Sequence, residues 1–91
     1  MKVSHLKAKA DYQLYVVFDD GVEGLVDLKD YIQKGVFSLL KNTKLFNAVY
    51  TTGYSVAWND ELEIDAITIY AELVNKSPAD ILSENLIHAT N

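Results

Sequence analysis

The sequence predicts an α+β domain built on an antiparallel sheet of about five strands in two hairpin units, with short helices in the middle and two C-terminal helices. Apolar side chains recur at every second position in residues 12–18, which is the period of a strand with one buried face. An Asp-Gly pair follows at 20–21, where glycine accepts the positive φ of a tight hairpin turn. Later, the order Ser-Pro-x-Asp at 77–80 is typical of a helix start.

The length of 91 residues fits a single domain, 1–91, with a real but shallow core. Hydrophobic residues make up 49% of the chain and charged residues 23%, which are ordinary values for a globular protein. The absence of cysteine excludes disulfides and thiolate chemistry. No apolar segment approaches the roughly 20 residues of a membrane helix, and the N-terminus has no apolar signal segment. We therefore expect a cytoplasmic protein that does not bind membranes.

The charge pattern argues against direct binding of nucleic acid. The formal net charge is −5, and all eight cationic side chains are lysines. Phosphate binding depends on clustered positive charge, and the bidentate contacts to guanine or phosphate need the guanidinium group of arginine. The early lysines are diluted by nearby acidic residues, which indicates a mixed, solvated surface.

The first third of the chain predicts three antiparallel strands, at residues 3–9, 12–18 and 22–28. All three are rich in β-branched, aromatic or alternating apolar residues. The second and third strands are joined by the Asp-Gly turn. Gly24 lies inside the third strand, where an isolated glycine predicts a β-bulge.

The middle of the chain predicts short helices and then a second hairpin. Residues 30–35 and 36–40 have the pattern of two short helical turns, and Thr43 is placed to cap a helix at 44–48. Strands are then expected at 49–52 and 54–58. A short segment follows in which Leu62 and Ile64 alternate with acidic residues.

Residues 65–74 favour a strand by local composition and a helix by the spacing of their apolar residues. We choose a helix, with Asp65 as its N-cap. A last helix is predicted at 77–89, capped by Ser77 and carrying an apolar stripe. We expect it to dock on the sheet or on a second subunit.

Taken in order, these features resemble a bacterial family known as domain of unknown function 2442, over about residues 2–73. The family pattern is an Asp-Gly hairpin, a strand ending in Asp-Leu, a Gly-x-Phe-x-x-Leu helix, a Phe, a hairpin ending in Trp, and an Asp-x-x-x-x-Tyr close. The matching residues, for which we expect structural roles, are Asp20, Gly21, Asp27, Phe37, Leu40, Phe46, Trp58, Asp65 and Tyr70. The sequence departs from the pattern at 59–61 and at Ala66, where members often have Asn-Gly and Pro.

The resemblance implies a small cytoplasmic α+β domain. Some members stand alone, some precede a helix-turn-helix domain, and some are encoded beside small partners in arrangements that look like toxin–antitoxin pairs. A full helix-turn-helix does not fit after the shared region here, so direct reading of DNA is not carried over. The family pattern brings no catalytic residue and no cofactor with it.

Asp60, Glu63 and Asp65 are the candidates for a metal site, because they belong to the densest acidic cluster. No glycine stands where an EF-hand loop needs one. On a strand, 61, 63 and 65 would all point outward, so we favour a solvated sheet edge. The two histidines, at 5 and 88, lie at opposite ends of the chain without a catalytic motif, and we expect no cofactor.

Four aromatic residues are candidates for contact with a partner: Trp58, Tyr54, Tyr50 and Tyr31. Trp is favoured at binding hot spots, and the three tyrosines lie near predicted turns. The competing interpretation of Trp58, which we favour, is a core or rim residue that closes the sheet.

The absence of a catalytic motif, together with the small partners that the resemblance implies for some members, favours a non-enzymatic protein-interaction domain. It would be one component of a toxin–antitoxin-like or regulatory pair, and a homodimer is expected because a small domain with edge strands gains from a partner. Two alternatives stay open. One is a small metal-dependent hydrolase or nuclease that uses the 60–65 acidic cluster, and the other is an accessory domain that senses a ligand between sheet and helices.

Overall fold

The computed structural model describes residues 1–77 and 79–82, and within them six strands form two three-stranded antiparallel sheets. Sheet A has the order β1-β2-β3 and sheet B the order β4-β5-β6. The strands are β1 (Val3–Lys9), β2 (Gln13–Phe18), β3 (Glu23–Asp27), β4 (Tyr50–Thr51), β5 (Ser55–Asn59) and β6 (Leu62–Asp65). The expected α+β class and hairpins are confirmed, but the single five-stranded sheet is wrong, because the two hairpin units form separate sheets.

Short helices occupy the middle of the chain, as the sequence predicted. They are the 3-10 helices η2 (Tyr31–Gln33) and η3 (Gly35–Lys41), followed by α1 (Thr43–Asn47). A further 3-10 helix, η1 (Ala10–Tyr12), lies between β1 and β2 and was not predicted, and α2 (Ala66–Val74) follows sheet B. Residues 79–82 are helical, and the backbone N–H of Asp80 donates to the Ser77 hydroxyl over 3.1 Å, which is the predicted cap. The remainder of the predicted helix 77–89 lies outside the described residues.

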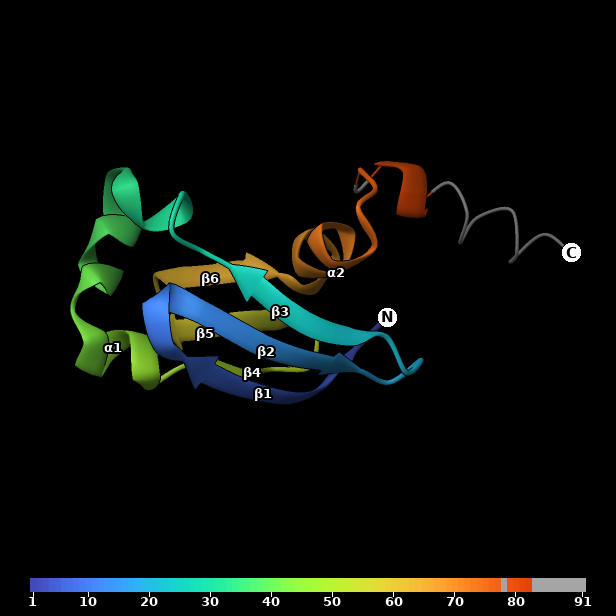
Figure 1. Cartoon of the computed structure of the whole chain (residues 1–91), viewed down its shortest axis with the longest axis horizontal. Coiled ribbons are helices and arrows are strands. Elements are labelled where there is room, and N and C mark those ends of the chain that lie inside the picture. Colours follow the sequence, from blue (N-terminus) through green and yellow to red (C-terminus); the bar gives the residue numbers. More distant parts are fainter. Residues whose placement is uncertain (78, 83–91) are drawn as a thin grey trace, which may run out of the picture.

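The two sheets are stacked as layers, with sheet A in front of sheet B in Figure 1. Successive side chains of a strand point to opposite faces, so each sheet has one apolar face to bury. The two inner faces form one core. Sheet A contributes Leu14, Val16, Phe18 and Val26 to it, and sheet B contributes Val56, Trp58, Leu62 and Ile64.

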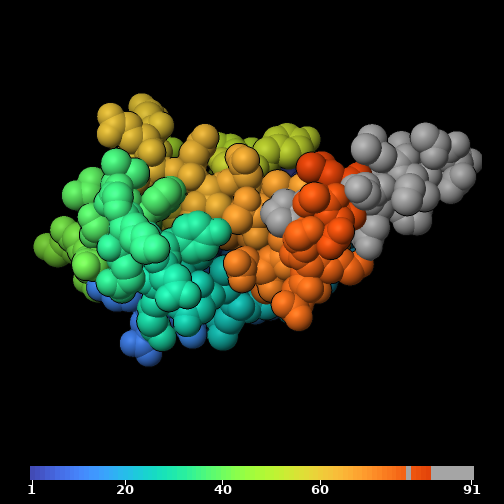
Figure 2. All heavy atoms as spheres, turned by 90° about the horizontal axis from the view of Figure 1, so that it is seen from above, coloured from blue at the N-terminus to red at the C-terminus, as the bar shows by residue number. Residues whose placement is uncertain are grey.

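At one edge the two layers meet through the backbone. The N–H of Val3, at the start of β1, donates to the carbonyl of Gly53, in the turn between β4 and β5, over 2.7 Å. Away from this edge, α2 contacts strands of both sheets, namely β3, β5 and β6. Figure 2 shows the orange side chains of α2 against the teal side chains of β3. The helix therefore covers the side on which the sheets are not joined.

Contacts from α2 to the β2–β3 hairpin hold the helix in place. Phe18 and Tyr70 pack edge to face with ring centroids 4.9 Å apart, and the Tyr70 hydroxyl donates to Asp20 Oδ2 over 2.7 Å. A Cβ atom at Gly24 would lie 3.0 Å from Leu73 Cδ2. The bulge predicted at Gly24 is wrong, since β2 and β3 pair there in continuous register. The glycine instead leaves room for a helix side chain.

Two predicted caps differ from the structure. The side chain of Asn42, not of Thr43, caps α1, because its Oδ1 accepts the backbone N–H groups of Lys44 and Leu45. Asn ranks above Thr as an N-cap residue, which explains the choice. Asp65 does occupy the N-cap position of α2, but its side chain makes no capping hydrogen bond. None of the helices in the described part of the chain has both the length and the apolar composition needed to cross a membrane.

The Tyr70–Asp20 hydrogen bond predicts a pH-dependent contribution to stability. It lowers the pKa of Asp20, with the backbone N–H of Val22 as the second cause. Because the folded pKa lies below the unfolded one, this stability is present above the unfolded pKa and is lost as pH falls through the folded pKa. At this exposed site we expect Tyr70→Phe to lower the free energy of unfolding at neutral pH by about 1 kcal/mol.

Urea denaturation at neutral and at strongly acidic pH measures this effect, and the difference between variant and parent should shrink at acidic pH. The exposed Tyr50 provides the matched control, since Tyr50→Phe removes the same atom from β4. An equal loss for both variants, or a Tyr70→Phe loss that persists in acid, would contradict the role given to the Asp20 carboxylate.

Candidate functional site

The acidic residues at the end of sheet B lie on its solvent side. In β6 the side chains of Leu62 and Ile64 are buried, while those of Glu63 and Asp65 are exposed, and Asp60 is exposed in the preceding turn. Within residues 1–77 and 79–82, no three histidine, aspartate or glutamate side chains converge closely enough to hold a metal ion. The metal-dependent alternative therefore gains no support from the arrangement of these carboxylates.

Trp58 lies inside the molecule. Its side chain is 4% exposed, and its indole N–H donates to the backbone carbonyl of Phe46 over 3.1 Å. The Phe46 ring stacks on it at 6.1 Å between centroids, and Tyr12 meets Phe46 edge to face at 5.3 Å. A buried indole N–H needs such a partner. Of the two interpretations of Trp58, the structure supports the residue that closes the sheet, because a buried side chain does not reach a partner.

The three tyrosine candidates do reach the surface, in different places. The side chain of Tyr54 is 69% exposed, that of Tyr50 is 45% exposed, and that of Tyr31 is half-buried. The ammonium of Lys2 lies 5.8 Å from the centroid of the Tyr54 ring. Tyr31 packs edge to face against Phe37 at 6.3 Å. Tyr31 begins η2, Tyr50 begins β4 and Tyr54 lies in the turn before β5, and Tyr31 and Tyr54 line different hollows.

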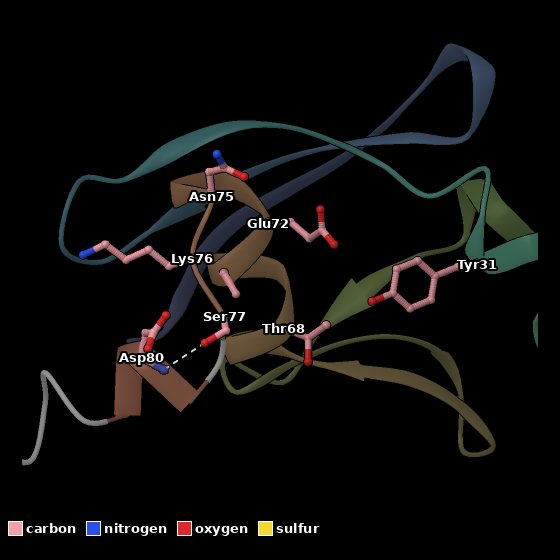
Figure 3. A pocket seen from close by; sticks show the side chains of 8 residues that line it. Tyr31, Thr68, Glu72, Asn75, Lys76, Ser77 and Asp80 are labelled. Atoms are coloured by element: carbon pink, nitrogen blue, oxygen red, sulfur yellow. Dashed lines mark hydrogen bonds between the residues drawn. The ribbon is translucent and has the colours of Figure 1, made fainter.

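An open hollow of about 470 Å³ lies between Tyr31, α2 and the start of the last helix (Figure 3). Thr68 and Glu72 enter it from α2, one helical turn apart, and Figure 3 shows the Tyr31 hydroxyl directed toward Thr68. Burial, and then the negative charge of Glu72, raise the pKa of Tyr31. The phenol therefore stays protonated at neutral pH. The lining offers hydrogen-bonding groups and no feature that selects a particular ligand.

A surface that the sequence analysis missed lies on η3. The side chains of Val36 and Leu39 are 59% and 58% exposed, which is high for large aliphatic residues. Residues three apart eclipse each other on a 3-10 helix, so these two form one outer ridge, which we call the η3 ridge. On the inner side, Leu40 is fully buried, and the Tyr12 hydroxyl donates to the Lys41 carbonyl over 2.6 Å.

The η3 ridge lies in a locally basic part of an acidic protein. Residues 29–44 contain four lysines and one acidic residue, Asp30, which gives this segment a net charge of +3 against −5 for the whole chain. Lys34 directly precedes η3 and Lys41 is its last residue, and both are exposed. Figure 2 shows this segment, in green, at one end of the molecule. No sequence signal marks the ridge, because Val36 and Leu39 are ordinary core residue types.

The residues of the family pattern serve the architecture. Asp20 accepts the Tyr70 hydroxyl, and Phe46 carries the carbonyl that binds the Trp58 indole. The side chain of Asp27 accepts the backbone N–H of Lys29 over 2.9 Å, which turns the chain after β3. Gly21 adopts the positive φ of the turn, Leu40 lies in the core and Phe37 packs against it. Asp65 occupies the N-cap position of α2 without a side-chain hydrogen bond to the helix.

These features define a small α+β domain of two antiparallel sheets closed by one helix. The sequence model of the family described as "Protein of unknown function (DUF2442)" matches residues 3–75, and the chain belongs to this family. This confirms the resemblance over residues 2–73. No curated protein matches the chain. The comparison with solved structures likewise finds no match.

The buried indole of Trp58 predicts a large effect on stability. Trp58→Phe removes the indole hydrogen bond to the Phe46 carbonyl and leaves a void where the larger ring was, while the carbonyl keeps its bond from the backbone N–H of Val49 over 3.3 Å. We expect the free energy of unfolding to fall by about 2–3 kcal/mol. Circular dichroism in urea measures this change. The chain has one tryptophan, and we expect its emission in the folded parent protein to be blue-shifted because the side chain is buried.

Tyr54→Phe is the matched control, because the Tyr54 side chain is exposed, and surface changes usually stay within about 0.5 kcal/mol. An emission spectrum of Trp58 that does not change on unfolding would refute the interior placement. So would a Trp58→Phe variant as stable as the parent.

Proposed function

We propose that this domain is a non-enzymatic interaction module and one component of a two-protein regulatory pair in the bacterial cytoplasm. The domain binds its partner through the η3 ridge. The observation that carries the proposal is the pair Val36 and Leu39, each more than half exposed on one side of a fixed helix. Covering a leucine or valine side chain with a partner contributes about 1.5–3 kcal/mol. A rigid ridge loses little conformational entropy on binding, so most of that gain is kept.

The charges around the ridge specify the chemistry of the partner. The exposed side chains of Lys34, Lys41 and Lys44 flank the ridge within a segment of net charge +3. A complementary surface has an apolar groove for Val36 and Leu39 and a rim of aspartate or glutamate side chains. Such complementary potentials accelerate association and select among partners more than they add affinity. The partner of this proposal is therefore a protein with an acidic-rimmed apolar groove.

Calorimetric titration with the purified product of the adjacent gene tests this proposal, because the resemblance implies that some members are encoded beside small partners. We expect binding that weakens as salt is added. Leu39→Glu should raise the dissociation constant by at least about tenfold, because it puts a carboxylate into an apolar contact with an acidic rim.

Leu25→Glu is the matched control for this titration. Leu25 is 55% exposed, almost the same as Leu39, but it lies on β3 of sheet A. The control should bind the adjacent gene product as the parent does. An absence of binding by the parent protein overturns the proposal, and so does binding that Leu39→Glu leaves unchanged.

A further inference from the structure

The outer face of sheet A is a second surface, separate from the η3 ridge. The inward positions of β2 and Val26 of β3 are buried, so the alternating positions between them point to the other side of the sheet. The strand register places the outward side chains in three rows across β1, β2 and β3. These rows are His5–Val17–Glu23, Lys7–Tyr15–Leu25 and Lys9–Gln13–Asp27.

The middle of this face is apolar. Tyr15 and Leu25 are cross-strand neighbours, and Val17 lies two positions along β2. Leu25 is 55% exposed. The Tyr15 hydroxyl donates to the carboxylate of Glu23, which raises the pKa of the tyrosine and orients its ring along the sheet. In Figure 1 no described element crosses in front of this face. The patch is therefore open to a flat partner.

The charges on either side of the apolar patch have opposite signs. On one side, β1 presents Lys7, Lys9 and the imidazole of His5, and all three are exposed. On the other side, β3 presents the exposed carboxylates of Glu23 and Asp27. The row Lys9–Gln13–Asp27 therefore runs from a cation on β1 to a carboxylate on β3, and the row His5–Val17–Glu23 runs from an imidazole to a carboxylate. When a second copy is turned so that its β1 lies opposite β3 of the first copy, the basic side of each copy meets the acidic side of the other.

We propose that the outer face of sheet A binds the same face of a second copy of this chain. A two-fold axis that lies between the two faces, parallel to β2, places β1 of each copy opposite β3 of the other. Lys9 then faces Asp27 of the second copy, and the apolar patches meet at the centre. Packed sheets cross at about −30°, which keeps these rows nearly opposed.

The charge pattern also selects this axis over the other face-to-face arrangement. An axis perpendicular to the strands would place β1 over β1 and β3 over β3, which brings like charges together. Within one chain Asp27 lies 3.5 Å from Lys29, and both side chains are about half exposed. In the dimer Asp27 therefore lies between Lys29 of its own chain and Lys9 of the second copy. Because this face is separate from the η3 ridge, the dimer does not depend on the proposed partner.

Sedimentation over a range of concentrations tests the dimer. The parent chain should sediment at twice the mass of one chain at micromolar concentration. Leu25→Glu should raise the dissociation constant of the dimer by about a hundredfold or more, since an isologous contact contains the residue twice. Leu39→Glu is the matched control and should sediment as the parent does. A parent chain that is monomeric at about 100 µM, or a dimer that Leu25→Glu leaves intact, overturns the proposal.

An exchange of charges tests the orientation. Lys9→Glu and Asp27→Lys should each weaken the dimer, whereas an equimolar mixture of the two variants should form a heterodimer, because every charge then meets its opposite across the axis. If Asp27→Lys does not fold, as circular dichroism will show, His5→Glu and Glu23→Lys give the same test in another row. A mixture that dimerises no better than its components overturns the proposed axis. The adjacent gene product bears only on the η3 ridge, so the two proposals can fail separately.

Discussion

The inner faces of sheets A and B bury their apolar side chains against each other, and the other features of the molecule depend on this contact. Three short strands are near the lower limit for an independently stable sheet, so each sheet needs the other to cover its apolar face. In β5 the side chains of Ser55 to Trp58 are all buried, which makes this strand the centre of the molecule. Ile69 of α2 is fully buried in the same core.

Polar contacts then fix how the short helices lie on this core. The Trp58 indole binds the Phe46 carbonyl, the Tyr12 hydroxyl binds the Lys41 carbonyl, and the Tyr70 hydroxyl binds Asp20. Each joins two segments that are distant in sequence. Several of these residues belong to the family pattern, so the pattern describes how a domain of this family is held together. Surfaces for interaction therefore have to be sought among exposed residues that the pattern omits, such as Leu25 and Leu39.

The sequence was sufficient for features that depend on neighbouring residues and insufficient for features that depend on distant ones. The period of two in β2, the Asp-Gly turn and the Ser77 cap are local, and they were predicted. Whether two hairpins share one sheet depends on contacts such as Val3 to Gly53, which no local pattern indicates. Gly24 was assigned to a bulge because its actual neighbour, Leu73, is nearly fifty residues away. The sequence likewise did not indicate that Leu39 is exposed, since leucine on a short helix usually faces the core.

The central claim is that the two sheets form one cooperative core. Native-state hydrogen exchange measures it directly, because amides of β2 and β5 report the opening of each sheet. The slowest amides of both strands should exchange with the same opening free energy, equal to that of global unfolding. The opening free energies of the two strands should decrease together when urea is added. Exchange of β5 amides at a clearly lower free energy than those of β2 would show that sheet B opens by itself, and would contradict the shared core.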